Sequence, residues 1–441
     1  MRGVLRATVR ARGAARAPGV IGRLLRGVLV IALLMAVSGC GDGPRQDRVT
    51  VMVPWSGGEF QAFYSVIRAF EKSTGIQVDV QVTRALTQQL DAAVTAGAPP
   101  DLAMLPSPGA IYQYARKDGN GGTRLRPLDT GTAAAYLEPF RSLATVRGTV
   151  YAIPVKADVK SLIWYNPQTT PRPQHPTLQT LATSATGHPL DLWCLGLASG
   201  PTSGWPGADW IADILLADPS EGSASRYRQW LSGDLDWAET SGAWKAWASM
   251  VGEDSLGKAA TLEYGEAAAG MTGPRPSCSL AHGTLSAMDF PAKLAPEKGY
   301  DFVTFTPGGP LQVSADFVGM FTDNTAAEQL LTYLSGGAAQ LAWVNYKEGY
   351  AISASRAVRP GKYRNVVQRR IAAMLWPDSG HLLCFSAADA MRTDVSAAFY
   401  RAVLSYATGA AHLSDLLRGL QAVQEDRGDS PVVPDDKLCT P

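Results

Sequence analysis

The sequence has few of the residues on which metal and nucleotide sites depend. Its 441 residues include only five cysteines and five histidines, and no two cysteines are spaced as Cys-x-x-Cys. A zinc site is therefore not expected, because such sites draw on closely spaced Cys and His ligands. No glycine pattern matches a dinucleotide-binding fingerprint or a P-loop. The sequence predicts no metal and no cofactor.

An excess of charge is also lacking, since 40 Lys and Arg residues face 39 Asp and Glu residues. The basic residues are unevenly placed, however, because residues 1–39 hold seven arginines and no acidic residue. Without that segment 33 basic and 39 acidic residues remain, a net charge of −6. A chain of that charge has no electrostatic attraction for a phosphate backbone, so nucleic acid is not an expected partner.

The N-terminal segment also lacks a long hydrophobic run, since its apolar run is only ten residues long, 28–37. Ten residues rise only about 15 Å in a helix, half the thickness of a bilayer core. Basic residues, a short apolar run and small residues predict a secretory signal peptide over residues 1–39. Val37-Ser38-Gly39-Cys40 resembles a bacterial lipobox, in which Cys40 would receive lipid. A plain signal peptide with an incidental cysteine is the alternative. Residues 40–48 would be the tether, and the chain would be exported and lipid-anchored at the outer face of the cell membrane.

The segment after the tether alternates between two hydrophobic periods. Period-two alternation predicts strands, and apolar residues three and four apart predict helices. These patterns give a β-α-β-α-β order over residues 49–53, 60–75, 76–82, 86–97 and 102–105. Such units form a parallel sheet with helices on both faces, and their ligands lie beyond the carboxyl ends of the strands. Those ends carry residues 54–59 and 106–109.

Tryptophan is concentrated in one part of the chain. Eight of the eleven tryptophans lie between residues 164 and 247. Some must belong to the core, but so many in 84 residues exceed what packing usually demands. We therefore expect indole rings at a binding site.

Several segments together resemble one family, the carbohydrate-binding lipoproteins of ABC importers within the family-1 extracellular solute-binding proteins. The α-glucoside-binding branch is the most similar. The most diagnostic segment is WCLGLASGPTSGWPGADWIADI, residues 193–214. The other segments are residues 51–63, 99–102, 106–109, 148–167, 278–286, 316 and 385–391.

The resemblance implies an α/β, two-lobed periplasmic-binding-protein-like fold, the Venus flytrap, with a hinge. The chain would cross between the lobes three times, near residues 154–157, 308–314 and 349–353. Lobe one would be residues 49–154 plus 311–349, and lobe two residues 157–308 plus 353–441. Sugar would lie in the cleft, and its binding would close the lobes.

Four cysteines remain after Cys40, and an exported chain permits disulfides between them. Sequence allows three connectivities. With the lobes placed as above, Cys194–Cys278 and Cys384–Cys439 are favoured, because each pair falls within one lobe or at its border. Free buried thiols are the alternative.

A sugar site must cover an apolar ring face and pair each buried hydroxyl, since an unpaired one costs about 1–3 kcal/mol. Carboxylates suit the hydroxyls because charge-assisted hydrogen bonds are about twice as strong as neutral ones. We expect Trp205 to stack on the ring and Asp209 to bind hydroxyls. A core tryptophan and a helix N-cap are the alternative roles. Five further candidates are Trp55, Glu59, Asp316, Tyr350 and His282, with Asp389 as a weaker one.

Two positions depart from the family pattern and leave the particular sugar open. Gly283 stands where relatives usually have glutamine, and Ser386 stands where an aspartate is common. In the family pattern Phe-Asp-x-Ser-Asp, Ser386 takes the place of the first aspartate, so only the second, Asp389, remains.

The expected function is capture of a sugar or oligosaccharide and its delivery to membrane permease subunits driven by a cytoplasmic ATPase. The protein would be a monomer and no enzyme, with membrane contact through its lipid alone. A secreted glycosidase is the rival, since Asp209 and Asp213 lie one helical turn apart. Two acids on one helix cannot flank a glycosidic bond from opposite sides, as that chemistry requires. A surface sugar sensor or adhesin would share the fold.

Overall fold

The computed structural model describes residues 48–116, 122–129, 131, 134–174, 191–218, 222–272, 275–347, 350–426 and 433–440. The predicted signal peptide, Cys40 and the tether up to residue 47 lie outside the described residues. Among the described residues, no helix combines the length and the apolar character needed to cross a membrane.

The predicted β-α-β-α-β order forms the first part of the fold. It consists of β1 (Arg48–Val53), α2 (Gly57–Thr74), β2 (Gln77–Val82), α3 (Leu86–Thr95) and β3 (Leu102–Leu105). Strand β1 pairs in parallel with both β2 and β3. Helix α2 buries its apolar stripe and ends at Gly75, whose φ of 78° is the left-handed conformation that glycine adopts readily. The sequence pattern of this segment is confirmed.

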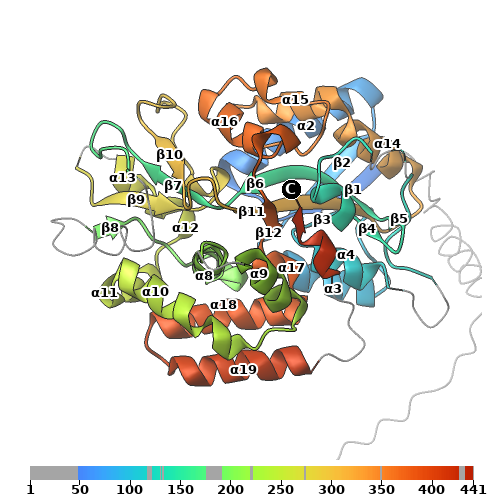
Figure 1. The fold of residues 1–441 in the computed structure, drawn as a ribbon. Coiled ribbons are helices and arrows are strands. Elements are labelled where there is room, and N and C mark those ends of the chain that lie inside the picture. Colours follow the sequence, from blue (N-terminus) through green and yellow to red (C-terminus); the bar gives the residue numbers. More distant parts are fainter. Residues whose placement is uncertain are drawn as a thin grey trace, which may run out of the picture. The chain divides into compact units, whose positions relative to one another are not determined.

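Strands from distant parts of the chain extend this sheet (Figure 1). The long strand β11 (Leu311–Met320) pairs with β3 at one end and with β12 (Leu383–Phe385) at the other. Strand β13 (Cys439–Thr440) follows β12, and β6 (Ala152–Val159) pairs along β11, so the order is β13-β12-β11-β3-β1-β2 with β6 beside β11. Because β12 and β3 share β11, strand pairing does not divide the chain at the predicted lobe boundaries, which stay a prediction.

A second, smaller sheet follows directly from β6. Its order is β10 (Asp301–Thr304), β7 (Leu162–Tyr165), β9 (Cys278–His282) and β8 (Asp191–Trp193). Strand β7 is antiparallel to both β10 and β9, whereas β8 and β9 are parallel. Two residues separate β6 from β7, so the two sheets are joined by a short and buried connection.

Helices supply the remaining layers. The tryptophan-rich segment contributes α8 (Trp205–Leu216), α9 (Ser223–Ser232) and α10 (Ser241–Val251), which pack with α18 (Thr393–Ala407) and α19 (Leu413–Glu425). The other helices are α4 (Pro108–Tyr114), α6 (Phe140–Leu143), α11 (Glu253–Ala259), α12 (Tyr264–Ala267), α13 (Ala269–Thr272), α14 (Thr325–Ser335), α15 (Gly337–Val344), α16 (Val366–Met374) and α17 (Ala387–Ala390). A short hairpin, β4 (Thr145–Val146) and β5 (Thr149–Val150), completes the strands of the described residues.

Most of the clustered tryptophans are core residues. Six of the eight between residues 164 and 247 are fully buried, namely Trp164, Trp210, Trp230, Trp237, Trp244 and Trp247. Trp230, Trp237 and Trp244 all pack against Phe399 of α18 with ring centroids 5.0–5.7 Å apart. The density of indoles that suggested a binding site is therefore largely explained by the packing of α8, α9 and α10 on α18.

The three segments predicted to cross between lobes lie side by side. Ala157 of β6 pairs with Ala315 of β11, and its backbone N–H donates a 2.7 Å hydrogen bond to the carbonyl of Ile352. Buried Gln340 joins two of the segments, because its amide donates to Val155 O and its carbonyl accepts from Ser353 Oγ. The three segments are therefore neighbours in the fold, and their role as crossings between two lobes stays a prediction.

Both favoured cysteine pairs form disulfides in the structure. Cys194 and Cys278 join the segment after β8 to β9. Cys384 and Cys439 join β12 to β13, which are also neighbours in the sheet.

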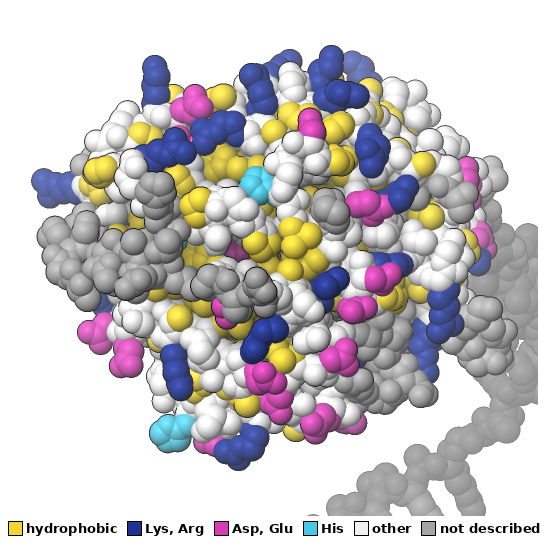
Figure 2. Space-filling model, viewed as in Figure 1, with side chains coloured by type: hydrophobic (Ala, Val, Ile, Leu, Met, Phe, Trp, Pro, Cys, Tyr) yellow, Lys and Arg dark blue, Asp and Glu magenta, His cyan; other side chains and the backbone are white. Residues whose placement is uncertain are grey.

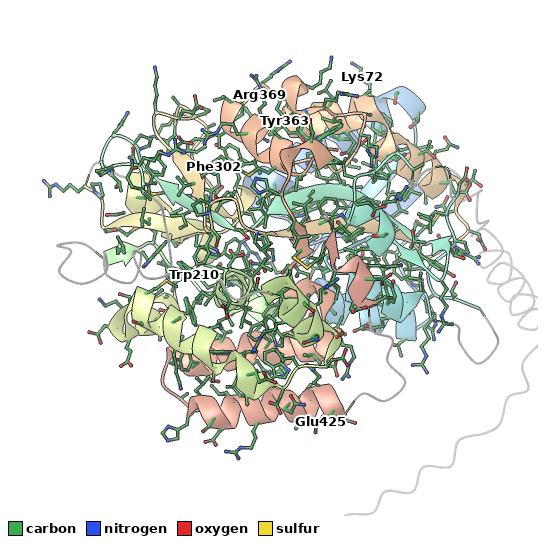
Figure 3. All side chains as sticks on the ribbon, in the orientation of Figure 1. Lys72, Trp210, Phe302, Tyr363, Arg369 and Glu425 are labelled. Atoms are coloured by element: carbon green, nitrogen blue, oxygen red, sulfur yellow. A yellow bond between two sulfur atoms is a disulfide. The ribbon has the colours of Figure 1, made fainter. Side chains whose placement is uncertain are left out.

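Charged side chains of both signs are interspersed on the face shown in Figure 2. The side-chain view in Figure 3 shows how densely the interior between the sheets and helices is filled, with Trp210 on α8 near its centre.

Candidate ligand-binding cavity

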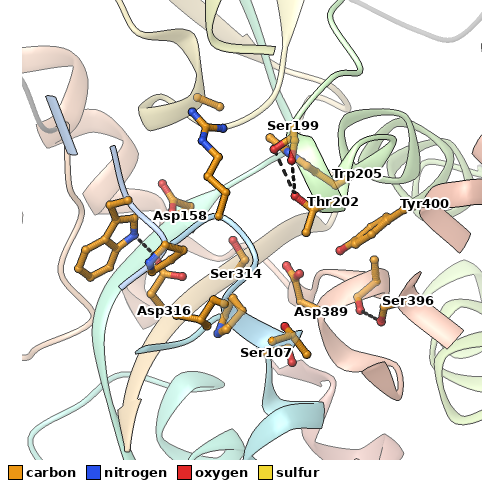
Figure 4. Close-up of a pocket in the computed structure, with 18 of the residues that line it drawn as sticks. Ser107, Asp158, Ser199, Thr202, Trp205, Ser314, Asp316, Asp389, Ser396 and Tyr400 are labelled. Atoms are coloured by element: carbon orange, nitrogen blue, oxygen red, sulfur yellow. Dashed lines mark hydrogen bonds between the residues drawn. The ribbon is translucent and has the colours of Figure 1, made fainter. Parts of the chain in front are cut away.

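A cavity of about 300 Å³ lies at the carboxyl ends of β1 and β3, beside β6 and β11. The segments after those strands line it, as expected for a sheet of this kind, with Trp55 after β1 and Ser107 after β3. Side chains from α8, α12, α17 and α18 line the other side. Figure 4 shows Asp158 and Asp316 on one side of the cavity and Trp205, Asp389 and Tyr400 on the other.

Strand β6 carries two buried lysines toward this cavity. Lys156 and Asp158 occupy alternate positions of the strand, and Lys160 follows its last residue by one. Alternate residues of a strand point to one face, so the three charged side chains share the cavity side of β6. Both lysines are almost completely buried, which is rare for lysine unless it is paired.

Lys156 is paired with three carboxylates. Its Nζ lies 2.7 Å from Glu59 Oε1, 3.0 Å from Asp158 Oδ2 and 3.7 Å from Asp316 Oδ2. It also donates to Ser286 Oγ at 3.2 Å. Burial alone would lower the pKa of Lys156, but the three acidic charges raise it well above its usual value. Burial raises the pKa of Asp316 to about 6 despite the nearby ammonium group.

Lys160 is paired with two carboxylates from helices. Its Nζ lies 2.9 Å from Asp209 Oδ1 on α8 and 2.9 Å from Asp389 Oδ2 on α17. It donates to Ser386 Oγ at 3.0 Å, and it lies 5.7 Å from the ring centre of Trp205. Burial raises the pKa of Asp209 to about 6, and the other oxygen of this carboxylate is buried with no hydrogen-bond partner among the described residues.

Aromatic side chains line both sides of the cavity. Trp55 donates its indole N–H to Asp316 Oδ2 at 3.0 Å and packs against Phe63 and Trp343. Trp205 is half-buried and meets Tyr264 edge to face, with ring centroids 4.9 Å apart. Tyr400 of α18 adds a phenol ring on the same side as Trp205 (Figure 4).

The structure brings most of the predicted site residues together. Trp55, Glu59, Trp205 and Asp316 line the cavity, and so does Asp389. Asp209 lies behind the cavity wall and reaches the site only through Lys160.

His282 and Tyr350 are not in the cavity lining, which corrects the expectation for both. His282 Nε2 lies 2.6 Å from Asp213 Oδ2, and its ring packs on Trp210 at 4.3 Å between centroids. The side chain is 1% exposed, so this pair serves the interior of the second sheet and α8. The Tyr350 hydroxyl donates to the carbonyl of Phe290 at 2.8 Å, and that internal bond holds it away from the site.

The two positions that depart from the family pattern, Ser386 and Gly283, both lie next to residues of the cavity lining. Ser386 accepts from Lys160, so the serine adds a neutral partner to that ammonium group. The carbonyl of Gly283 accepts a hydrogen bond from Trp164 Nε1 at 2.8 Å. Gly283 directly precedes Thr284, which lines the cavity.

The residues that sequence reasoning missed are Lys156, Asp158, Lys160, Tyr264 and Tyr400. A signal was present for the first three, because a polar Lys/Asp segment interrupts two apolar stretches between residues 150 and 165. Tyr264 and Tyr400 come from segments with no distinguishing pattern and reach the cavity only through the fold.

The arrangement is suited to binding hydroxyl groups. Glu59 and Asp389 each give one oxygen to a lysine, and no described residue donates to the other oxygen. No group of three potential metal ligands occurs among the described residues. Asp213, the helical neighbour of Asp209 that could mimic a glycosidase pair, is buried against Ser161 and His282.

The fold and this cavity define a solute-binding protein, and the comparison of sequences agrees. Residues 65–369 match the family described as bacterial extracellular solute-binding protein, and the chain belongs to that family. The resemblance seen in the sequence is confirmed at this level, and membership of a solute-binding family agrees with the expectation that the chain is no enzyme.

Two curated relatives are similar over most of the chain. The osmoprotective compounds-binding protein GgtB of Synechocystis sp. is 28% identical over 411 residues, which cover 87% of this chain and 94% of GgtB. The alpha-glucosides-binding periplasmic protein AglE of Rhizobium meliloti is 27% identical over 338 residues, covering 69% and 72%. Among solved structures, the bacterial solute receptor AcbH matches with a TM-score of 0.69 at 15% identity, covering 87% of this chain and 98% of AcbH. That last likeness supports the solute-binding protein fold.

Proposed function

We propose that this chain is the substrate-binding protein of an ABC importer and captures a sugar or a related osmoprotectant, with α-glucosides as the first class to test. The names of GgtB and AglE support osmoprotectants and α-glucosides respectively. The observation that carries the proposal is the cavity itself, which lysine-held carboxylates and indole rings line together.

The aromatic and the acidic residues of the cavity would recognise different parts of a sugar. Trp205 presents a half-buried ring that can cover the apolar face of a sugar. Glu59 and Asp389 can each accept a hydroxyl hydrogen with the oxygen that no lysine holds. Lys156 and Lys160 fix those carboxylates, so the acceptors are positioned before the ligand arrives.

Capture would be coupled to closure of two lobes about the segments that meet at Ala157. A ligand shifts such an equilibrium only by its differential affinity for the closed state. The closed form would then be recognised by membrane permease subunits driven by a cytoplasmic ATPase. Lipid on Cys40 would hold the monomeric protein at the outer face of the membrane.

A ligand screen with the purified chain tests the proposal. Thermal shift against maltose, trehalose, sucrose, glucose, galactose and glycerol glycosides is followed by calorimetric titration of each compound that raises the Tm. At least one compound should bind and remain chemically unchanged after prolonged incubation. If no compound binds, the proposed function is wrong; if a product forms from maltose, trehalose or a longer α-glucan, the glycosidase reading replaces it.

A further inference from the structure

All three cationic side chains that line the cavity are already paired. Lys156 and Lys160 are held by three and two carboxylates, as described above. Arg84, the third, donates to Ser56 Oγ at 3.0 Å, and its other terminal nitrogen lies 3.9 Å from Glu263. A ligand anion would therefore have to displace a carboxylate to reach either buried lysine, and the cation left to it is Arg84, whose side chain is 44% exposed and therefore well hydrated.

Acidic groups, in contrast, keep unused hydrogen-bonding capacity. No described residue donates a hydrogen bond to Glu59 Oε2, Asp316 Oδ1 or Asp389 Oδ1. The lining contains four carboxylates against three cations, and Asp209 stands behind it as a fifth. The charged groups of the lining therefore sum to −1, or to −2 when Asp209 is included.

The N-terminus of helix α2 is a feature of the fold that would favour an anion. Helix α2 begins next to the cavity, and the N-terminus of a helix favours an anion. Glu59 lies in the first turn of that helix, so the protein's own carboxylate already occupies the favourable place.

We infer that the cavity accepts uncharged or amino-substituted sugars and polyols and rejects their acidic counterparts, such as uronic acids and sugar phosphates. The inference rests on the proposed function and narrows its substrate class by charge. The recognisable chemistry is a hydroxyl or ammonium donor presented to a free carboxylate oxygen, with both buried lysines already held by carboxylates.

Matched ligand sets test this inference at pH 7.5 by calorimetric titration of the full chain. Each set has a neutral, an acidic and an amino member: glucose, glucuronate and glucosamine; galactose, galacturonate and galactosamine; and methyl α-glucoside, methyl α-glucuronide and methyl 6-amino-6-deoxy-α-glucoside. Trehalose and trehalose 6-phosphate form a further pair. In the set whose neutral member binds, the acidic member should bind at least about a hundredfold more weakly, because like charges are brought together without water between them. The amino member should bind within about tenfold of the neutral one.

The outcomes separate this inference from the proposed function. An acidic member that binds within threefold of its neutral counterpart overturns the inference while the proposed function stands. If no neutral sugar binds, in these sets or in the earlier screen, the proposed function fails and the inference fails with it.

A pair of variants identifies the residues that carry the rejection. Asp389→Asn removes one cavity charge and leaves Lys160 with a neutral amide acceptor in place of a carboxylate, so the ratio of the acidic member's Kd to the neutral member's Kd should fall about tenfold. The control, Glu425→Gln, removes the same charge at the end of α19, where Glu425 is labelled in Figure 3; this residue is not part of the cavity lining. It should leave the ratio unchanged; an equal effect of both variants would mean that net charge, and not this cavity, decides the discrimination.

Discussion

The two tryptophans of the cavity, Trp55 and Trp205, are the same residue type in opposite situations. Trp55 is 4% exposed, its N–H is bonded to Asp316, and two aromatic rings pack against it. Trp205 is half-buried and has one aromatic neighbour, while Lys160 lies over its ring. The first ring completes the wall and the core behind it, whereas the second keeps accessible surface at the cavity, where the proposed function requires a ligand contact. A residue type and its place after a strand or before a helix therefore do not by themselves distinguish support from contact.

The largest expected effect separates these two roles directly. Trp55→Ala should lower the free energy of unfolding by about 3–5 kcal/mol, because it removes a large buried side chain and leaves Asp316 without its indole partner. Trp205→Ala should cost less than half of that and should abolish detectable sugar binding. Denaturant unfolding and calorimetric titration measure the two effects.

Trp376→Ala is the matched control for the second ring. Trp376 is also half-buried and lies 5.4 Å beneath a cation, Arg359, but it is not in the cavity lining. Binding should survive this change; if it is lost, or if Trp205→Ala binds normally, the contrast drawn here is wrong.

The carboxylates around Lys156 and those around Lys160 form two ionic clusters, and these provide a second comparison within the same cavity. Lys156→Met leaves three carboxylates without their cation, of which Asp158 is buried and the other two are largely buried, and it should destabilise the protein by about 3–5 kcal/mol. Lys160→Met leaves two. Each cluster contains one carboxyl group whose pKa is already about 6, Asp209 or Asp316, so the number of carboxylates left without a cation decides the difference. The Lys160 variant should therefore unfold at higher denaturant concentration than the Lys156 variant, and the reverse order would contradict the account of both clusters.

Stability should also depend on pH through the two carboxyl groups whose pKa values are raised, Asp209 and Asp316. Asp209 and Asp316 have pKa values near 6 in the folded protein, against about 4 in an unfolded chain. The folded state therefore binds more protons between pH 4 and 6, so these groups make stability fall as pH rises through that window. Asp209→Asn should flatten this part of the pH profile by an amount on the order of 1 kcal/mol, measured by denaturant unfolding at pH 4.5 and 7. A profile identical to that of the unmodified chain would show that Asp209 titrates normally.

The smallest effect is expected at Arg84. Its side chain is 44% exposed and its closest acidic oxygen is 3.9 Å away, so Arg84→Ala should change stability by less than about 1 kcal/mol. A larger loss, measured by the same unfolding experiment, would place Arg84 with the two buried lysines.

Much of the architecture could be predicted because it depends on local patterns. The alternation at residues 49–53 and the helical spacing of Phe63, Ile67 and Phe70 produced the elements that the structure contains. Trp55 and Glu59 were identified because they directly follow a strand whose end faces ligands in such sheets. These inferences needed only neighbours in the sequence.

The buried ionic clusters could not be predicted in this way. Lys160 meets Asp389 across 229 residues, and charged residues between apolar stretches are usually solvent-exposed. His282 was a reasonable ligand candidate until its pairing with Asp213 was known, a contact between β9 and α8 across 69 residues. Residue type indicated which groups were chemically able to bind, and only the tertiary fold determined which of them already had partners.

Strand β6 and the residue directly after it bring two features of the fold together, namely the buried lysines of the cavity and the contacts with two other chain segments. Lys156 directly precedes Ala157, the residue at which three segments of the chain meet, and Lys160 follows three residues later. Any twist of this strand must re-aim both ammonium groups at once and disturb five acidic partners together. The lysines of the cavity lining and the point where the three segments meet are thus connected through a few bonds of backbone, without a relay of side chains between them.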